Sequence, residues 1–96
     1  MYEVVFTDAA AKQWKMLDGI VKKLIAQALK RRQLNPFVPG SELHGELSGC
    51  YKIKFRAAGI RLVYRIDGER LLIIVLSVGS REKGHAYIEA QDNPDL

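Results

Sequence analysis

The sequence has few of the residues from which disulfide-stabilised, membrane-bound or metal-dependent proteins are built. It contains a single cysteine, Cys50, which excludes an internal disulfide and is typical of a reducing compartment. The longest apolar run covers residues 71–76, far short of a membrane span, and no secretory signal is expected at the N-terminus. We therefore expect a small cytoplasmic domain with no membrane partner.

The sequence also lacks the patterns of a metal site or a phosphate-binding loop. His, Cys, Asp and Glu do not cluster at the spacing of metal ligands, and the eight glycines are scattered through turns. His44 and His85 are expected at the surface, and Cys50 is expected to be a small apolar residue rather than a nucleophile. We predict neither a metal nor a cofactor.

Acidic residues are scarce in the second half of the chain. Lys and Arg number 15 against 11 Asp and Glu, and residues 49–85 carry eight basic and three acidic side chains. In residues 86–96 the charged side chains are all acidic. A local positive field favours a polyanionic partner or an acidic protein, although mild basicity is common among small domains.

Hydrophobic periodicity predicts one α+β domain over residues 1–96. Helices are expected over about 9–17, with Thr7 or Asp8 as N-cap, and over about 20–34. Strands are expected over residues 2–6, 51–56, 60–67 and 71–78. The order is β-α-α-β-β-β: an N-terminal strand, a helical hairpin, a three-stranded antiparallel meander and a short C-terminal helical turn, with the helices packed on one face of the sheet.

The connections and the second helix give more detailed expectations. Segment 37–49 is rich in Pro and Gly and predicts a loop long enough for a functional role, and Asp67-Gly68 predicts a tight hairpin. The second helix is expected to bury the apolar stripe Ile20, Val21, Leu24, Ile25, Ala28 and Leu29. Its basic residues are expected to be mostly solvated: Lys22, Lys23, Lys30, Arg31 and Arg32.

Basic side chains gather on one face of the predicted sheet. Alternation places three of them, in strand 51–56, opposite the core, and the next strand brings a fourth back toward them. A fifth follows the last strand, and a tyrosine lies six residues beyond it. The set is Lys52, Lys54, Arg56, Arg61, Arg81 and Tyr87. It fits a phosphate backbone with a base stacked on a ring, but a solvated sheet face explains the alternation at least as well.

These residue types are suited to cleaving RNA without a metal. Attack by the RNA's own 2′-hydroxyl needs a base, cationic stabilisation of the phosphorane and an acid for the leaving 5′-oxygen. A lysine held among other cations has its charged form disfavoured, so its pKa falls toward the range useful for a base. An arginine stays charged and holds phosphate oxygens.

The same residues carry a resemblance to a known family. The segments Cys50–Arg56, Gly59–Tyr64 and Val78–Glu82, with Tyr87, resemble the RelE toxins of bacterial type II toxin–antitoxin systems, over nearly the whole chain. The resemblance implies a compact α+β fold and endonucleolytic cleavage of mRNA in the ribosomal A site, without a metal, leaving a 2′,3′-cyclic phosphate. It implies two partners: a RelB-like antitoxin, through which alone operator DNA is bound and the operon repressed, and the 70S ribosome with its mRNA and rRNA.

The resemblance also implies roles for individual residues. Lys54 would be the general base or a transition-state stabiliser, and Lys52 and Arg61 would hold the phosphate. Arg81 would stabilise or protonate the leaving group, although so high a pKa is awkward for an acid. Tyr87 would stack on the nucleotide or share the base role. Further RNA contacts are expected from Arg56, Lys83 and His44.

The chain departs from the family pattern at two places. His44 precedes Gly45 where many relatives carry a basic residue, which predicts a weaker or pH-dependent phosphate contact there. Residues 89–96 are acidic and contain Pro94, which predicts a truncated or frayed C-terminal helix. Neither departure removes a residue of the expected site.

Two other hypotheses remain open. A ParE-like toxin on the same scaffold would bind DNA gyrase without cleaving RNA, and a plain nucleic-acid or protein-binding module would need only the charge. The discriminating feature is the full set of basic residues with Tyr87, which a gyrase binder has no reason to assemble. The nuclease is therefore the favoured hypothesis.

Overall fold

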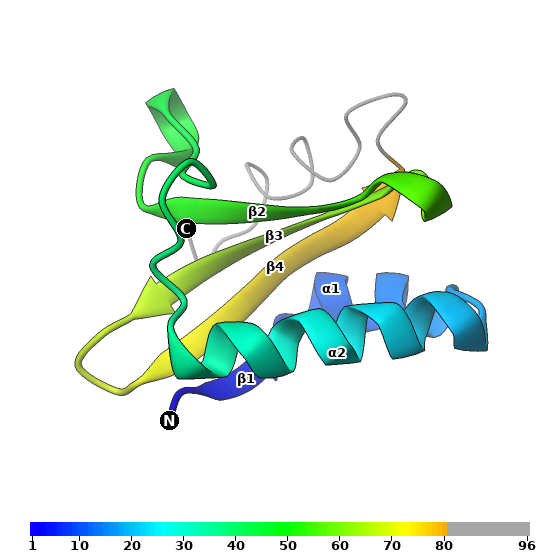
Figure 1. Ribbon diagram of the computed structural model, residues 1–96, viewed down its shortest axis with the longest axis horizontal. Helices are drawn as coiled ribbons and strands as arrows, with labels where there is room; N and C mark the ends of the chain where they lie inside the picture. The colour runs from blue at the N-terminus through cyan, green and yellow to red at the C-terminus, as the bar shows by residue number, and fades with distance from the viewer. Residues whose placement is uncertain (81–96) are drawn as a thin grey trace.

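A computed structural model describes residues 1–80, which form two helices and four strands in the predicted order (Figure 1). The strands are β1 (Glu3–Phe6), β2 (Cys50–Phe55), β3 (Ile60–Asp67) and β4 (Leu72–Ser80). The helices are α1 (Asp8–Lys15) and α2 (Gly19–Leu34), and short 3-10 turns occupy Gly45–Leu47 and Arg56–Ala58. The expected C-terminal helical turn lies outside the described residues.

The N-terminal strand joins the sheet beside β4, so the sheet is four-stranded and mixed. The strand order is β1-β4-β3-β2, with β1 parallel to β4 and the other neighbouring pairs antiparallel. The sequence predicted a three-stranded antiparallel meander and gave the first strand no partner. Alternation identifies a strand but not its neighbour, and a parallel partner lies a long connection away in the sequence.

Side-chain caps begin both helices. Of the two candidate caps for α1, Thr7 is the one used: its Oγ1 accepts the N–H of Ala10 at 3.2 Å. The same hydroxyl donates to the carbonyl of Leu76 at 3.4 Å, which ties α1 to β4. Asp18 caps α2 by accepting the N–H of Val21 at 2.9 Å. Such caps stabilise a helix by about 1 kcal/mol each.

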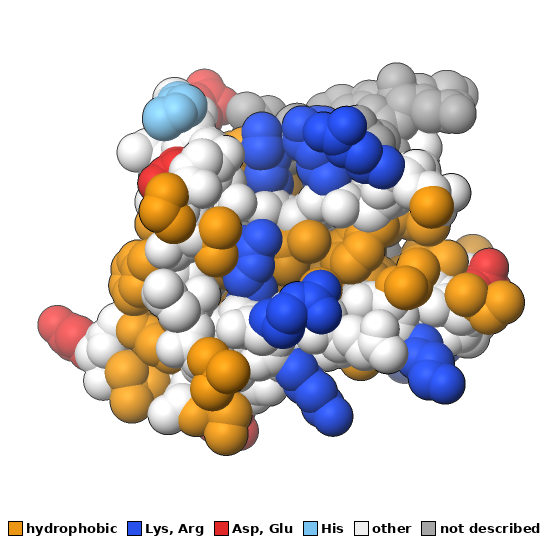
Figure 2. Space-filling model, viewed as in Figure 1, with side chains coloured by type: hydrophobic (Ala, Val, Ile, Leu, Met, Phe, Trp, Pro, Cys, Tyr) orange, Lys and Arg blue, Asp and Glu red, His pale blue; other side chains and the backbone are white. Residues whose placement is uncertain are grey.

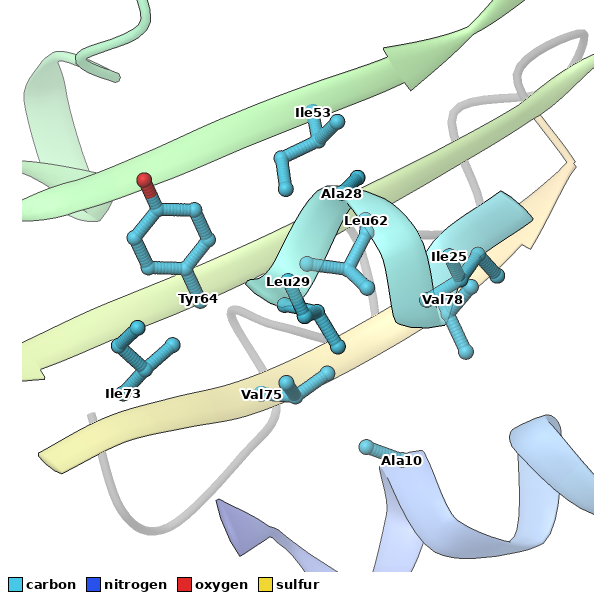
Figure 3. Close-up of a cluster of buried hydrophobic side chains, with 10 residues drawn as sticks. All are labelled: Ala10, Ile25, Ala28, Leu29, Ile53, Leu62, Tyr64, Ile73, Val75 and Val78. Carbon is cyan, nitrogen blue, oxygen red and sulfur yellow. The ribbon is translucent and has the colours of Figure 1, made fainter. Parts of the chain in front are cut away.

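The main core lies between the helices and one face of the sheet (Figure 3). As alternation predicted, Tyr51, Ile53 and Phe55 of β2 face this core. Burying each large apolar side chain contributes about 1.5–3 kcal/mol to folding. The fully or nearly buried members are Ala10, Ile25, Ala28, Leu29, Ile53, Leu62, Tyr64, Ile73, Val75 and Val78.

The buried stripe of α2 is narrower than predicted. Ile25, Ala28 and Leu29 are buried, but Ile20 is 78% exposed and Leu24 is 41% exposed. Helical spacing predicts which side of the helix is apolar, but the sheet covers only part of that side.

The opposite face of the sheet is partly covered as well. Cys50, Val63 and Leu76 form a second buried cluster there, closed by Leu47 from the 37–49 loop. Cys50 is thus a buried apolar residue, as predicted, and burial raises the pKa of its thiol. The basic part of this face is therefore confined to the rest of the sheet, beyond the buried cluster.

The β3–β4 connection is longer than the predicted tight hairpin. Asp67 pairs with Leu72, so residues 68–71 form the turn. The Asp67 carboxylate accepts the N–H groups of Glu69 and Arg70, each at 3.1 Å. Within this turn Leu71 adopts a positive φ of 56°, whereas Gly68 does not adopt a positive φ.

Candidate functional site

An open cleft of about 320 Å³ lies along the outer edge of β2. Figure 2 shows Lys and Arg side chains gathered from this edge down over α2, while acidic side chains lie at the margins of the same face. Four of its lining residues in the described part of the chain are cationic and none is acidic. Within residues 1–80 the lining residues are Arg32, Gly40, Ser41, Lys52, Ile53, Lys54 and Arg56.

One wall of the cleft is a loop that docks on β2 like a short additional strand. The N–H of Lys52 donates to the carbonyl of Ser41 at 3.0 Å, and the N–H of Leu43 donates to the carbonyl of Cys50 at 2.9 Å. At the head of the wall, Gly40 has a φ of +83°, a conformation that favours glycine. The loop thus fixes one side of the cleft against the strand that carries the lysines.

The cleft contains the cations that alternation had grouped on β2. Lys52 and Lys54 lie two residues apart on one face of the strand, and Lys54 is the register partner of Arg61 on β3. Residues directly opposite in an antiparallel pair have Cβ atoms about 4.5–5.5 Å apart. Like charges so placed lower the stability of a sheet, and such an arrangement suits a site for an anion.

Arg56 belongs to the cleft but not to the strand. β2 ends at Phe55, and Arg56 opens the following 3-10 turn, which closes at Gly59 with a φ of 66°. Arg56 is exposed and lines the cleft from that turn. Its predicted position on the strand is wrong, but its predicted neighbourhood with the two lysines is confirmed.

Arg32 is the cleft residue that the sequence analysis missed. It was expected to be solvated, but it is half-buried, and its Nη1 donates to the Tyr64 hydroxyl at 2.6 Å. It follows the buried residues Ala28 and Leu29 by four and three positions, which places it on the inner side of α2. That spacing is the signal that would have found it.

Of the other predicted site residues, Arg61 and His44 lie in the described part of the chain and do not line the cleft. His44 is exposed, directly before the 3-10 turn, and is not among the lining residues. Arg81, Lys83 and Tyr87 lie outside the described residues. The last described residue, Ser80, pairs with Ile60, the chain neighbour of Arg61.

Residues 1–80 contain neither a candidate metal site nor a helix that could span a membrane. No group of three or more His, Cys, Asp and Glu side chains in this range is placed to hold a metal ion. Neither α1 nor α2 is long and apolar enough to cross a membrane.

Comparison of the sequence with known proteins assigns the chain to a family. A family model for the ParE toxin of the type II toxin–antitoxin system parDE matches residues 4–84. An Escherichia coli protein described as RelE-like toxin is 43% identical over 86 residues, 90% of each chain. The mRNA interferase toxin RelE of E. coli strain K12 is 36% identical over 89 residues, 93% of each chain.

Solved structures agree. A mutant E. coli RelE toxin in the free state matches with a TM-score of 0.85 and 34% identity, covering 95% of each chain. A mutant of the same toxin bound to a peptide of the antitoxin RelB matches with a TM-score of 0.79 and 35% identity, covering 93% of each chain. The fold and the family match define a toxin of a type II toxin–antitoxin system. Within that class, the chain belongs to the RelE family of the RelE/ParE superfamily.

Proposed function

We propose that this toxin is a ribosome-dependent endonuclease that cuts mRNA in the ribosomal A site and so inhibits translation. The observation that carries the proposal is the pairing of Lys54 on β2 with Arg61 on β3. Lys52 lies on the same face of β2 as Lys54, and both lysines line the basic cleft. Fixed cations around a phosphodiester stabilise the charge that develops on its oxygens in the transition state. The relative from E. coli K12 is named an mRNA interferase, which supports the same activity.

The proposed reaction is a transesterification within the RNA. The 2′-oxygen bonds to the adjacent phosphorus, the bond from phosphorus to the 5′-oxygen breaks, and a 2′,3′-cyclic phosphate remains. Lys54 takes the 2′-hydroxyl proton or stabilises the transition state, while Lys52 and Arg61 hold the phosphate. Arg81 stabilises or protonates the leaving 5′-oxygen, and Tyr87 stacks on the nucleotide or shares the base role. One proton is removed and one delivered, so the step needs no metal or other co-reactant.

The proposed partners follow from the same activity. The ribosome, with its mRNA and rRNA, holds the substrate in the geometry for attack, and Arg56, Lys83 and His44 add contacts to RNA. A RelB-like antitoxin neutralises the toxin, as the solved complex of the E. coli relative supports. Together the pair represses its operon, so operator DNA is bound only through that complex. The toxin acts where ribosomes are, in the cytoplasm.

Inhibition of DNA gyrase is the second candidate, because the matching family model is described as a ParE toxin. A gyrase inhibitor works by binding and needs no set of cations around a phosphodiester. The grouping of Lys52, Lys54 and Arg61 therefore favours the nuclease.

Primer extension on a defined mRNA tests the proposal, using the purified chain with and without ribosomes paused at a known codon. We expect a cut within the A-site codon only when ribosomes are present. The upstream fragment should resist 3′-end ligation until its cyclic phosphate is opened and the resulting terminal phosphate is removed. No cut in either reaction, together with inhibition of gyrase in a supercoiling assay, would replace the proposal with the gyrase alternative.

A further inference from the structure

Arg32 joins the cleft from a different layer of the fold than the other cations. Lys52, Lys54 and Arg56 belong to β2 and the turn after it, whereas Arg32 lies in the last turns of α2. Arg32 thereby places a positive charge on the wall of the cleft that α2 forms. None of the ion pairs found between residues 1–80 involves Arg32.

The Arg32 guanidinium is held in place before any ligand binds. Nη1 donates to the Tyr64 hydroxyl at 2.6 Å, and that hydroxyl donates to the carbonyl of Pro36 at 2.7 Å. Tyr64 is fully buried, and its ring stacks on Tyr51 with centroids 5.6 Å apart. Burial raises the pKa of Tyr64 while Arg32 opposes the shift, so the hydroxyl remains a donor at neutral pH.

This anchoring has a consequence for binding. A guanidinium carries five N–H donors, and the bond to Tyr64 uses one, which leaves further donors for phosphate oxygens. Because the side chain is already ordered by a buried partner, less conformational entropy is lost when it binds an anion. A solvated arginine on the outer face of α2 has no such advantage.

We propose that Arg32 is a substrate-binding residue that contacts the RNA backbone on the helix side of the cleft, at a phosphate other than the one cleaved. The proposal rests on the proposed nuclease function and adds α2 to its RNA interface. Lys54 and Arg61 are paired on the neighbouring strands β2 and β3, where the chemical step is proposed. Arg32 lines the cleft from α2 instead, so its role is in binding and not in the chemical step.

The test compares two substitutions that remove the same charge from neighbouring positions of one helix. Arg32→Gln removes the anchored guanidinium, and Arg31→Gln removes an exposed one that does not line the cleft. The purified full chain is titrated onto ribosomes paused on a defined mRNA, and the single-turnover cleavage rate is followed against toxin concentration. The titration yields a half-saturating concentration and a maximal rate, each measured at several salt concentrations.

We expect Arg32→Gln to raise the half-saturating concentration about tenfold, the size of a lost charge-assisted hydrogen bond, with little change in maximal rate. Its salt dependence should lose about one unit of slope, because one phosphate contact is gone. Arg31→Gln should change the half-saturating concentration by less than about twofold. Arg32→Lys, which keeps the charge but not the planar fork, should give an intermediate shift and serves if the Gln variant does not fold.

Each contrary outcome has a definite reading. Equal shifts for the two Gln variants, or a fall in melting temperature with no shift in half-saturation, would overturn the inference and leave Arg32 a structural partner of Tyr64. A fall in maximal rate alone would also overturn it. If the wild-type chain cuts no mRNA on ribosomes, the proposed function fails and this inference with it, whereas wild-type cleavage with no difference between the variants refutes this inference only.

Discussion

The two sides of β2 illustrate opposite uses of one strand. Tyr51, Ile53 and Phe55 turn toward the helices and join a closed apolar core. Lys52 and Lys54, between them, turn to the other face and line an open basic cleft. Substitutions on the first side should therefore lower stability, whereas substitutions on the second should lower activity with little effect on stability.

The largest loss of stability is expected in the core. Leu62 is fully buried on β3, one of the two inner strands of the sheet, so Leu62→Ala should lower the free energy of unfolding by about 2–5 kcal/mol through lost burial and a residual cavity. Urea denaturation followed by circular dichroism measures it. Ile20→Ala, at a residue 78% exposed, is the matched control and should change it by less than about 1 kcal/mol. Similar losses for the two variants would contradict the burial of Leu62 in the core and the exposure of Ile20 on α2.

A smaller loss is expected at the polar group within the core. Tyr64→Phe keeps the ring stacked on Tyr51 but removes the acceptor of Arg32 and the donor to Pro36. The carbonyl of Pro36 keeps its bond from the N–H of Val38 at 3.1 Å, so the cost is the loss of the two hydrogen bonds of the hydroxyl, about 1–3 kcal/mol in total. The same denaturation experiment checks this value. An unchanged free energy of unfolding would mean that the Arg32–Tyr64–Pro36 chain is not formed in solution.

A loss at alkaline pH is expected from Cys50 and Tyr64. Burial raises the pKa of both groups above their ordinary values of 9.0 and 10.0, so the folded state holds each proton more tightly than the unfolded state. Stability from this source is complete below those values and is lost as the pH rises through the raised ones. Unfolding followed from pH 7 to 11 should show a decline that begins at higher pH in Cys50→Ala than in the wild type. Parallel curves would contradict burial of the thiol.

The smallest effect on stability is expected in the cleft. Lys54 is exposed, so Lys54→Ala should change the free energy of unfolding by no more than about 0.5 kcal/mol. Thermal melting of the two proteins in one buffer is sufficient to detect a larger change. A large loss would assign Lys54 to the framework of the sheet and remove the contrast between the two sides of β2.

The sequence predicted most of this fold because its strands and helices repeat simple periods. The alternation in β2 and β3 separated core residues from cations, and the cap at Thr7 and the end of α2 were within reach of local rules. The parallel place of β1 and the exposure of Ile20 and Leu24 depend on which surfaces meet in three dimensions. Local periodicity carries no information on that choice.

The site divides in the same way. Lys52, Lys54 and Arg61 were grouped by alternation and one hairpin turn, and the register confirms the group. Helical spacing from Ala28 and Leu29 indicates that Arg32 lies on the inner side of α2, but its hydrogen bond to Tyr64 depends on a contact distant in the sequence. The loop that forms one wall of the cleft is likewise held by a hydrogen bond from the backbone N–H of Lys52 to the carbonyl of Ser41. A backbone hydrogen bond of this kind cannot be predicted from the types of the two residues.

The most direct test of the central claim is the single-turnover rate at which Lys54→Ala cuts ribosome-bound mRNA, beside Lys23→Ala as a control on the exposed face of α2. At equal concentrations of folded protein, we expect Lys54→Ala to be slower than the wild type by about two to three orders of magnitude, the usual cost of losing one preorganised charge-stabilising group. Lys23→Ala should keep the wild-type rate. Cleavage by Lys54→Ala at the wild-type rate would contradict the assignment of the β2 cleft as the nuclease site.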